Sequence, residues 1–137
     1  MEKVKLQAQY GLYINGEWRN ASDGATYNAE SPADGSHLAI CAQGSREDVE
    51  AASAAAWEAF KTWKKTTPAQ RAALLNKIAN IIDANKEHLA MVESMDNGKP
   101  IRETMNVDIP MAAEHFRYFA GCILAEEGQA SVLNEQF

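Results

Sequence analysis

Apolar and polar residues alternate with period two in the first third of the chain, which predicts short β-strands. The first strand covers residues 10–14, and Asn15-Gly16 directly after it favours a type I′ hairpin turn with a return strand over residues 17–19. Two further strands are predicted, one over residues 26–30 and one from Leu38 to near Gly44.

From residue 45 onward the apolar positions recur at helical spacing. Ser45 is expected to cap the first helix through its hydroxyl, and Glu47 and Asp48 suit the positive end of the helix dipole. We expect an inner face made of Val49, Ala52, Ala56, Phe60 and Trp63.

Three further helices follow. Thr67, Pro68 and Gln70 form a strong start signal for the second, because Thr67 caps, Pro68 needs no hydrogen bond there and Gln70 reaches back. Asn97-Gly98 ends the third, which covers about residues 86–95. The apolar stripe of the second helix is Leu74, Leu75, Ile78, Ile81 and Ile82.

The last helix is predicted over residues 101–126. Pro110 removes one backbone donor, so we expect a kink or restart near Asp108. A strand is predicted over residues 131–133. The expected inner face of this helix is Phe116, Phe119, Ala120, Ile123 and Leu124.

The order of elements predicts an α+β chain, with a β-hairpin and short strands followed by about four helices. Its 137 residues fit one domain, which at ordinary compactness buries about two-thirds of its unfolded surface. The net charge of −6 and the pI near 5.0 argue against a nucleic-acid partner. No apolar run approaches the ~20 residues that span a bilayer, so no membrane partner is expected.

The reactive residue types do not form a recognisable catalytic pattern. Cys41 and Cys122 lack metal or redox spacing and are interpreted as small buried hydrophobes, reduced in a cytoplasmic protein, although a disulfide between them stays open. His37, His88 and His115 are scattered without a metal motif. The pair Glu47-Asp48 is interpreted as solvated surface and Lys99 as an exposed linker residue. No catalytic or cofactor-binding residue is assigned.

Six strings occur in order between about residues 9 and 130. They are Leu12 to Trp18 (LYINGEW), 31–35 (SPADG), 48–50 (DVE) before an Ala-rich helix, Arg71 with Leu74-Leu75 and Ile78-Ala79, 93–100 (ESMDNGKP) with Glu103-Thr104, and 115–121 (HFRYFAG) with 126–128 (EEG). Together they resemble the N-terminal quarter of an NAD(P)-dependent aldehyde dehydrogenase. Residues 101–104 and 108–110 look most like the bacterial acetaldehyde or short-chain branch.

The resemblance implies an α/β family fold with a Rossmann-like cofactor domain, a catalytic domain and an oligomerisation arm. Residues 1–137 would form the N-terminal part of the cofactor domain and end near the start of that arm. The family enzyme oxidises an aldehyde to a carboxylic acid with NAD or NADP, through a cysteine nucleophile and a glutamate-activated water. The family's catalytic Cys, general-base Glu and cofactor turn are missing here, so the chain alone is expected to be inactive and to bind neither NAD nor NADP.

The resemblance also implies a structural Na⁺ or K⁺ held by backbone carbonyls. The matching positions are Ala29, Glu30 and Asp96, although the family more often has Thr and a β-branched residue at the first two. A hard cation needs several oxygen ligands, and a further one normally comes from chain that is absent here.

Three hypotheses follow. In the first, the chain is an N-terminal segment of an aldehyde dehydrogenase that self-associates or binds the missing remainder. In the second, it is a free-standing, non-enzymatic interaction module with a helical core. In the third, it is an unrelated small enzyme with a histidine site. The first expects exposed stripes that include Leu74, Ile78, Phe116 and Ile123.

Overall fold

A computed structural model describes residues 4–128 and confirms a mixed architecture of short strands followed by helices. The strands are β1 (Gln9–Tyr10), β2 (Leu12–Ile14), β3 (Glu17–Arg19), β4 (Thr26–Glu30) and β5 (His37–Ala42). The helices are α1 (Arg46–Trp63), α2 (Pro68–Ala84), α3 (Lys86–Asn97), α4 (Ile101–Glu103) and α5 (Ile109–Leu124), and a π-helical segment, η1 (Thr104–Asp108), joins the last two.

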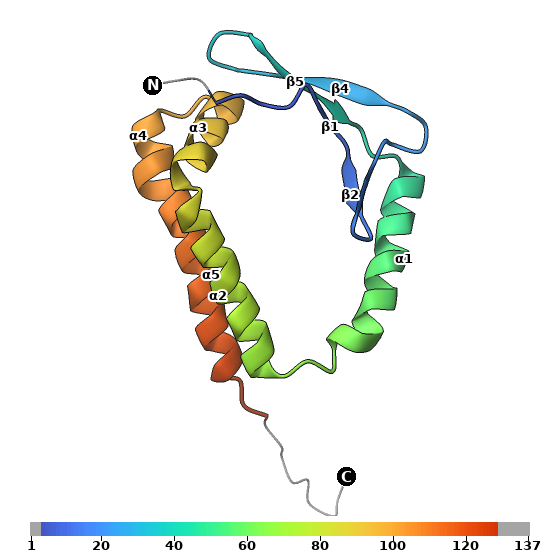
Figure 1. Cartoon of the computed structure of the whole chain (residues 1–137), viewed down its shortest axis with the longest axis vertical. Coiled ribbons are helices and arrows are strands. Elements are labelled where there is room, and N and C mark those ends of the chain that lie inside the picture. The colour runs from blue at the N-terminus through green and yellow to red at the C-terminus, as the bar shows by residue number, and fades with distance from the viewer. Residues whose placement is uncertain (1–3, 129–137) are drawn as a thin grey trace, which may run out of the picture.

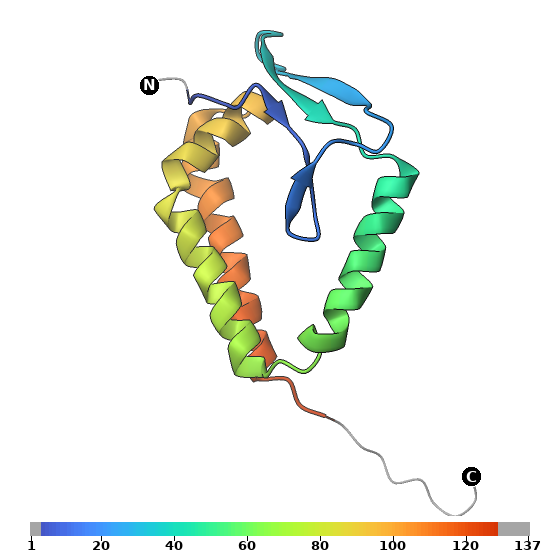
Figure 2. The same ribbon diagram turned by 45° about the vertical axis from the view of Figure 1, so that its right-hand side comes forward.

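The elements form an open frame rather than a ball (Figure 1). The strands lie at one end, α1 runs down one side, and α2 and α5 run side by side down the other (Figure 2). The linker of residues 64–67 closes the far end of the frame. Within residues 4–128, no helix has the combination of length and apolar character that crossing a bilayer requires.

Two small sheets share the strand end. β2 and β3 form the predicted hairpin, and positive φ angles of 54° at Asn15 and 83° at Gly16 fit the expected type I′ turn. In the second sheet β5 lies in the centre, antiparallel to β4 and parallel to β1.

Gly11 divides what the alternation predicted to be a single strand over residues 10–14. The chain leaves one sheet and enters the other at this residue. A Cβ atom placed there would lie 2.7 Å from the carbonyl oxygen of Arg19. The prediction of one continuous strand is therefore wrong, because the backbone of the hairpin passes too close for a side chain.

The helix boundaries follow from their caps. The Ser45 and Thr67 hydroxyls each accept from the backbone amide three residues on, and both caps are complete capping boxes. Gly98 ends α3 in the left-handed region, with φ of 77°. The predicted start and stop signals are confirmed.

The last predicted helix is interrupted by a π-helical segment, and α5 begins at Ile109, which confirms the expected restart near Asp108. Thr104 is fully buried there, and its hydroxyl donates to the carbonyl of Ala90 in α3 at 2.9 Å. Pro110 lies in the first turn of α5, where a missing N–H costs little. The helix ends at Leu124, two residues before the predicted end. The strand predicted over residues 131–133 lies outside the described residues.

The buried core is built almost entirely from alanine. Among the described residues, Ile109 is the only buried apolar side chain larger than a methyl group. Small side chains let α2 and α5 approach closely, and Arg117 of α5 donates to Asp83 of α2. The buried apolar residues are Ala21, Ala39, Ala72, Ala79, Ala90, Ile109, Ala113 and Ala120.

The frame consequently exposes much more surface than a compact protein. The chain exposes 10537 Å², whereas a compact protein of this mass exposes about 7,000 Å². Folding therefore buries about half of the unfolded surface, and the expectation of two-thirds is wrong. Many of the large apolar side chains among residues 4–128 are left exposed.

The predicted inner faces are wrong at their largest side chains for the same reason, although Ala120 of the α5 face is buried. On α1, Val49, Phe60 and Trp63 are all exposed, and on α5 so are Phe119 and Leu124. Of the stripes expected to lie bare, Leu74 is exposed, whereas Ile78, Phe116 and Ile123 are half-buried. Packing of α2 against α5 accounts for that difference.

Gly11→Ala should destabilise the protein, because its Cβ would meet the Arg19 carbonyl oxygen. We expect the free energy of unfolding to fall by about 1–3 kcal/mol, as for other overpacked sites. Gly121→Ala is the matched control, since a Cβ in that helix meets nothing within 4 Å. It should stabilise the protein by about 0.5–1 kcal/mol. Urea unfolding of both variants measures this, and equal stabilities would contradict the close approach at Gly11.

Candidate functional site

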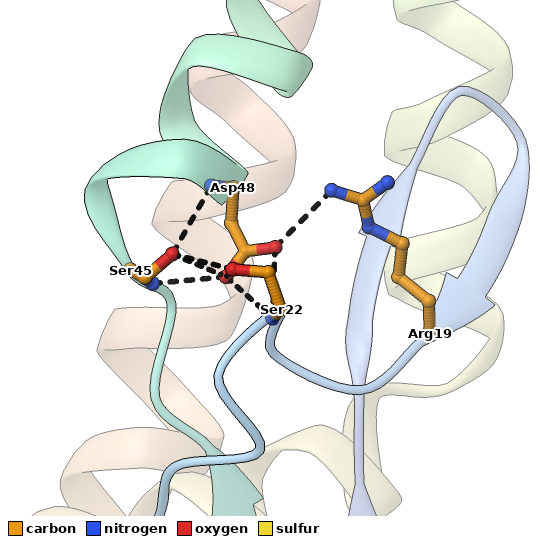
Figure 3. A network of polar contacts seen from close by, with 4 residues as sticks. All are labelled: Arg19, Ser22, Ser45 and Asp48. Carbon is orange, nitrogen blue, oxygen red and sulfur yellow. Dashed lines mark hydrogen bonds and ion pairs between the residues drawn. The ribbon is translucent and has the colours of Figure 1, made fainter.

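The best-formed polar site among the described residues lies where α1 meets the strands, and Figure 3 shows its four residues. Asp48, in the first turn of α1, is only 2% exposed. Its carboxylate accepts from the backbone amides of Ser45 at 2.9 Å and Ser22 at 3.1 Å, and from both serine hydroxyls. Arg19 of the hairpin adds an ion pair at 3.2 Å.

These contacts act on the protonation of Asp48. The backbone amides of Ser45 and Ser22 are the main causes that lower its pKa to about 2, against partial desolvation. The carboxylate therefore stays charged in all but strongly acidic solution. Interpreting Glu47-Asp48 as a solvated pair is wrong for Asp48, because only its neighbour Glu47 points to solvent.

A second junction joins the end of β4 to the C-terminal end of α3. A Cβ at Gly98 would lie 3.0 Å from the Cγ of Pro32, so the two segments touch. Cys41 of β5 is the largest cause of the raised pKa of Tyr27 in β4, and the charge of Asp96 is the smallest of the four causes.

The three residues matched to the family's cation site lie around this junction. Ala29 and Glu30 are the last two residues of β4, and the ladder to β5 shifts register between them. Asp96 is exposed in the last turn of α3. No group of three His, Cys, Asp or Glu side chains that would suit a metal occurs within residues 4–128, so a cation here would depend on backbone oxygens.

Lys99 is more engaged than its interpretation as an exposed linker residue suggested. Its ammonium group donates to the Asp108 carboxylate of η1 at 2.7 Å, and this contact is the main cause of its raised pKa. Its backbone carbonyl accepts from the Ser94 hydroxyl. The residue therefore ties the end of α3 to the π-helical segment.

The cysteines and histidines do not come together. Cys41 is half-buried in β5, whereas Cys122 on α5 is exposed, which contradicts its interpretation as a buried hydrophobe. Both thiols are free, so the structure decides against a disulfide between them. The three histidines are exposed on β5, α3 and α5. A catalytic nucleophile needs a base within hydrogen-bond reach. The positions of these cysteines and histidines do not favour any of them as a nucleophile with such a base.

Comparisons with known proteins identify the family to which the chain belongs. The model of the aldehyde dehydrogenase family matches residues 18–136. This chain belongs to the aldehyde dehydrogenase family. It corresponds to an N-terminal segment of the family enzyme.

Relatives in the aldehyde dehydrogenase family are similar to nearly the whole chain. A long-chain-aldehyde dehydrogenase of Acinetobacter is 46% identical over 97% of the chain. An acetaldehyde dehydrogenase of Pseudomonas aeruginosa is 44% identical over 96%. In both cases the chain spans 26% of the relative's own length.

Solved aldehyde dehydrogenase structures share the frame. The crystal structure of PnpE in complex with nicotinamide adenine dinucleotide superposes with a TM-score of 0.88 and 38% identity, covering 93% of this chain and 26% of that one. An aldehyde dehydrogenase from Burkholderia cenocepacia gives 0.89 and 36%, covering 94% and 26%. The hypothesis of an unrelated small enzyme with a histidine site is therefore wrong.

The charge on Asp48 should make stability depend on acidity. Its folded pKa lies below the ordinary value of 3.8, so its contribution is complete above about pH 5 and is lost as the pH falls toward 2. Asp48→Asn should lower Tm at pH 7 and flatten the pH dependence of Tm between pH 5 and 2.

Glu47→Gln is the matched control, because Glu47 is adjacent in sequence and exposed. Thermal melts of the three proteins across this pH range measure the effect. A parallel loss of Tm with acidification in the Asp48→Asn variant would show that the buried carboxylate is not responsible.

Proposed function

We propose that this chain is the N-terminal part of the cofactor-binding domain of an enzyme that oxidises an aldehyde to a carboxylic acid with NAD or NADP. The observation that carries this proposal is the match of nearly the whole chain to about a quarter of each relative's length. The NAD complex of PnpE supports the nicotinamide cofactor. Relatives named for acetaldehyde and for long-chain aldehydes support an aliphatic substrate. The acetaldehyde dehydrogenase supports the short-chain branch that residues 101–104 and 108–110 resemble.

The chain by itself is proposed to be inactive and to bind no nicotinamide cofactor. Cys41 lies across the β4–β5 pair from Tyr27, and Cys122 lies exposed on a helix far along the chain. Neither has the neighbouring base that activates a thiol for attack on a carbonyl. Nucleophile, base and cofactor turn would all come from the rest of the family chain.

We further propose that the isolated chain self-associates and that the enzyme is cytoplasmic. Exposed aromatic side chains on α1 and α5 support self-association, because water-exposed apolar patches of this size are covered by other protein surfaces. Two free thiols support a reducing compartment.

A structural Na⁺ or K⁺ is proposed at the junction of β4 and α3, bound by the backbone carbonyls of Ala29, Glu30 and Asp96. The register shift between Ala29 and Glu30 supports this, since a bulge leaves backbone groups of the ladder unpaired. The last carbonyls of a helix also lack partners within the helix, which suits Asp96. The cation would brace this corner of the frame.

A free-standing interaction module is the alternative to a segment of an enzyme. The same exposed aromatic residues would serve either role. Family membership favours the segment, because 97% of the chain matches a relative about four times its length.

A graft tests the proposed function. Replacing the matching quarter of the Pseudomonas aeruginosa acetaldehyde dehydrogenase with this chain should give an active enzyme, whereas the chain alone should not reduce NAD with acetaldehyde. NADH absorbance measures both, and the intact relative is the control. An inactive graft, or turnover by the chain alone, would overturn the proposal.

The cation proposal predicts a specific salt effect on stability. With Na⁺ or K⁺ at about ten times its Kd, Tm of the chain should rise by about 5 °C relative to tetramethylammonium at equal ionic strength. The large organic cation screens charge equally but cannot enter a carbonyl cage. Identical melting curves in the three salts would argue against the site.

A further inference from the structure

One side of α1 carries a group of uncovered aromatic rings, here named the α1 aromatic face: Trp57, Phe60 and Trp63. Their side chains are 69%, 46% and 45% exposed. The rings of Trp57 and Phe60 meet edge to face with centroids 5.9 Å apart. They line a shallow hollow of about 280 Å³ together with Ser53 and Ala56.

The composition of this face is that of the centre of a protein interface. Tryptophan and other aromatic residues dominate the binding energy of such interfaces, and small neighbours give them a pocket. The Lys64 ammonium lies 5.7 Å from the Phe60 ring and adds a cationic rim. Two indole rings left in water would not contribute to the stability of α1 itself.

The amount of uncovered surface indicates how large an interface the chain can form with a partner. The chain exposes 10537 Å², about 3,500 Å² more than a compact protein of its mass. Permanent complexes bury about 2,000–5,000 Å² counted over both partners, which is about 1,000–2,500 Å² on each. The uncovered surface of this chain is therefore large enough to supply one side of an obligate interface.

The ties that hold the frame together lie within the described residues. Asp48 joins α1 to the strand end, Thr104 joins η1 to α3, and Arg117 joins α5 to α2. Covalent continuity with further chain is not needed for any of these contacts. The frame can therefore present its apolar faces to a partner that is a separate polypeptide.

We propose that this chain docks non-covalently onto the remaining three quarters of an aldehyde dehydrogenase chain and restores its activity in trans, with the α1 aromatic face as the anchor. The inference rests on the proposed function. Its occupant follows from length, because the chain spans 26% of its relatives and the rest of that family chain is the surface with which it is otherwise continuous.

The test combines this chain with the Pseudomonas aeruginosa acetaldehyde dehydrogenase lacking its matching quarter. Both pieces are co-expressed, purified and titrated against each other, and NAD reduction with acetaldehyde is measured. We expect saturable activity. Trp57→Asp should raise the apparent Kd by about 30-fold, which is the loss of affinity typical of an aromatic hot spot.

Trp18→Asp is the matched control, since Trp18 is also 69% exposed and also contacts an aromatic ring, that of Tyr13 at 5.0 Å between centroids, but it lies in β3, outside the α1 aromatic face. It should leave the apparent Kd within about threefold. Both variants should keep the parent's far-UV circular dichroism, because neither ring is buried in the frame.

The covalent graft described above separates the two levels of the proposal. An active graft with no activity in trans overturns docking and leaves the proposed function standing. An inactive graft overturns the proposed function itself. Activity in trans that Trp57→Asp and Trp18→Asp reduce equally overturns the α1 aromatic face as the anchor.

Discussion

The buried charge of Asp48 fixes the point at which α1 joins the strand end of the frame. Apolar packing normally sets the angle between a helix and the strands beside it, but α1 presents its large side chains to solvent. The carboxylate instead gathers backbone amides from Ser22 and Ser45 and the guanidinium of Arg19 onto one point. Charge-assisted hydrogen bonds are directional, so this contact sets where α1 begins and leaves its far end to be fixed by other surfaces.

The alanine core has the complementary effect. Small side chains suffice to join α2 to α5, and many of the large apolar side chains remain exposed on the surface of the frame. A frame of this kind is ordered at its corners and open along its sides. This explains how a chain can share a quarter of the aldehyde dehydrogenase fold at a TM-score near 0.88 while its sides stay open.

The sequence was most informative where structure depends on residues within four positions of one another. The hairpin turn, both capping boxes and the glycine stop at Gly98 belong to this class. The break at Gly11 and the burial of Asp48 escaped prediction, because their partners lie 8 to 29 residues away. Hydrophobic periodicity marked the apolar face of α1 correctly as apolar, but it cannot say whether the covering layer is in the same chain. The candidate cation residues came from resemblance alone, since backbone oxygens carry no side-chain signal.

The π-helical segment sets the direction in which α5 faces. Buried positions in this part of the chain fall at Thr104, Ile109 and Ala113, a step of five followed by a step of four. One residue in a helix turns its face by about 100°, and the wider π turn absorbs that rotation locally. The π turn of η1 therefore holds one residue more than an α-helical turn would. The aromatic rings of α5 consequently point where they would in a regular helix one residue shorter, and the rotational phase of the entire last helix depends on those five residues.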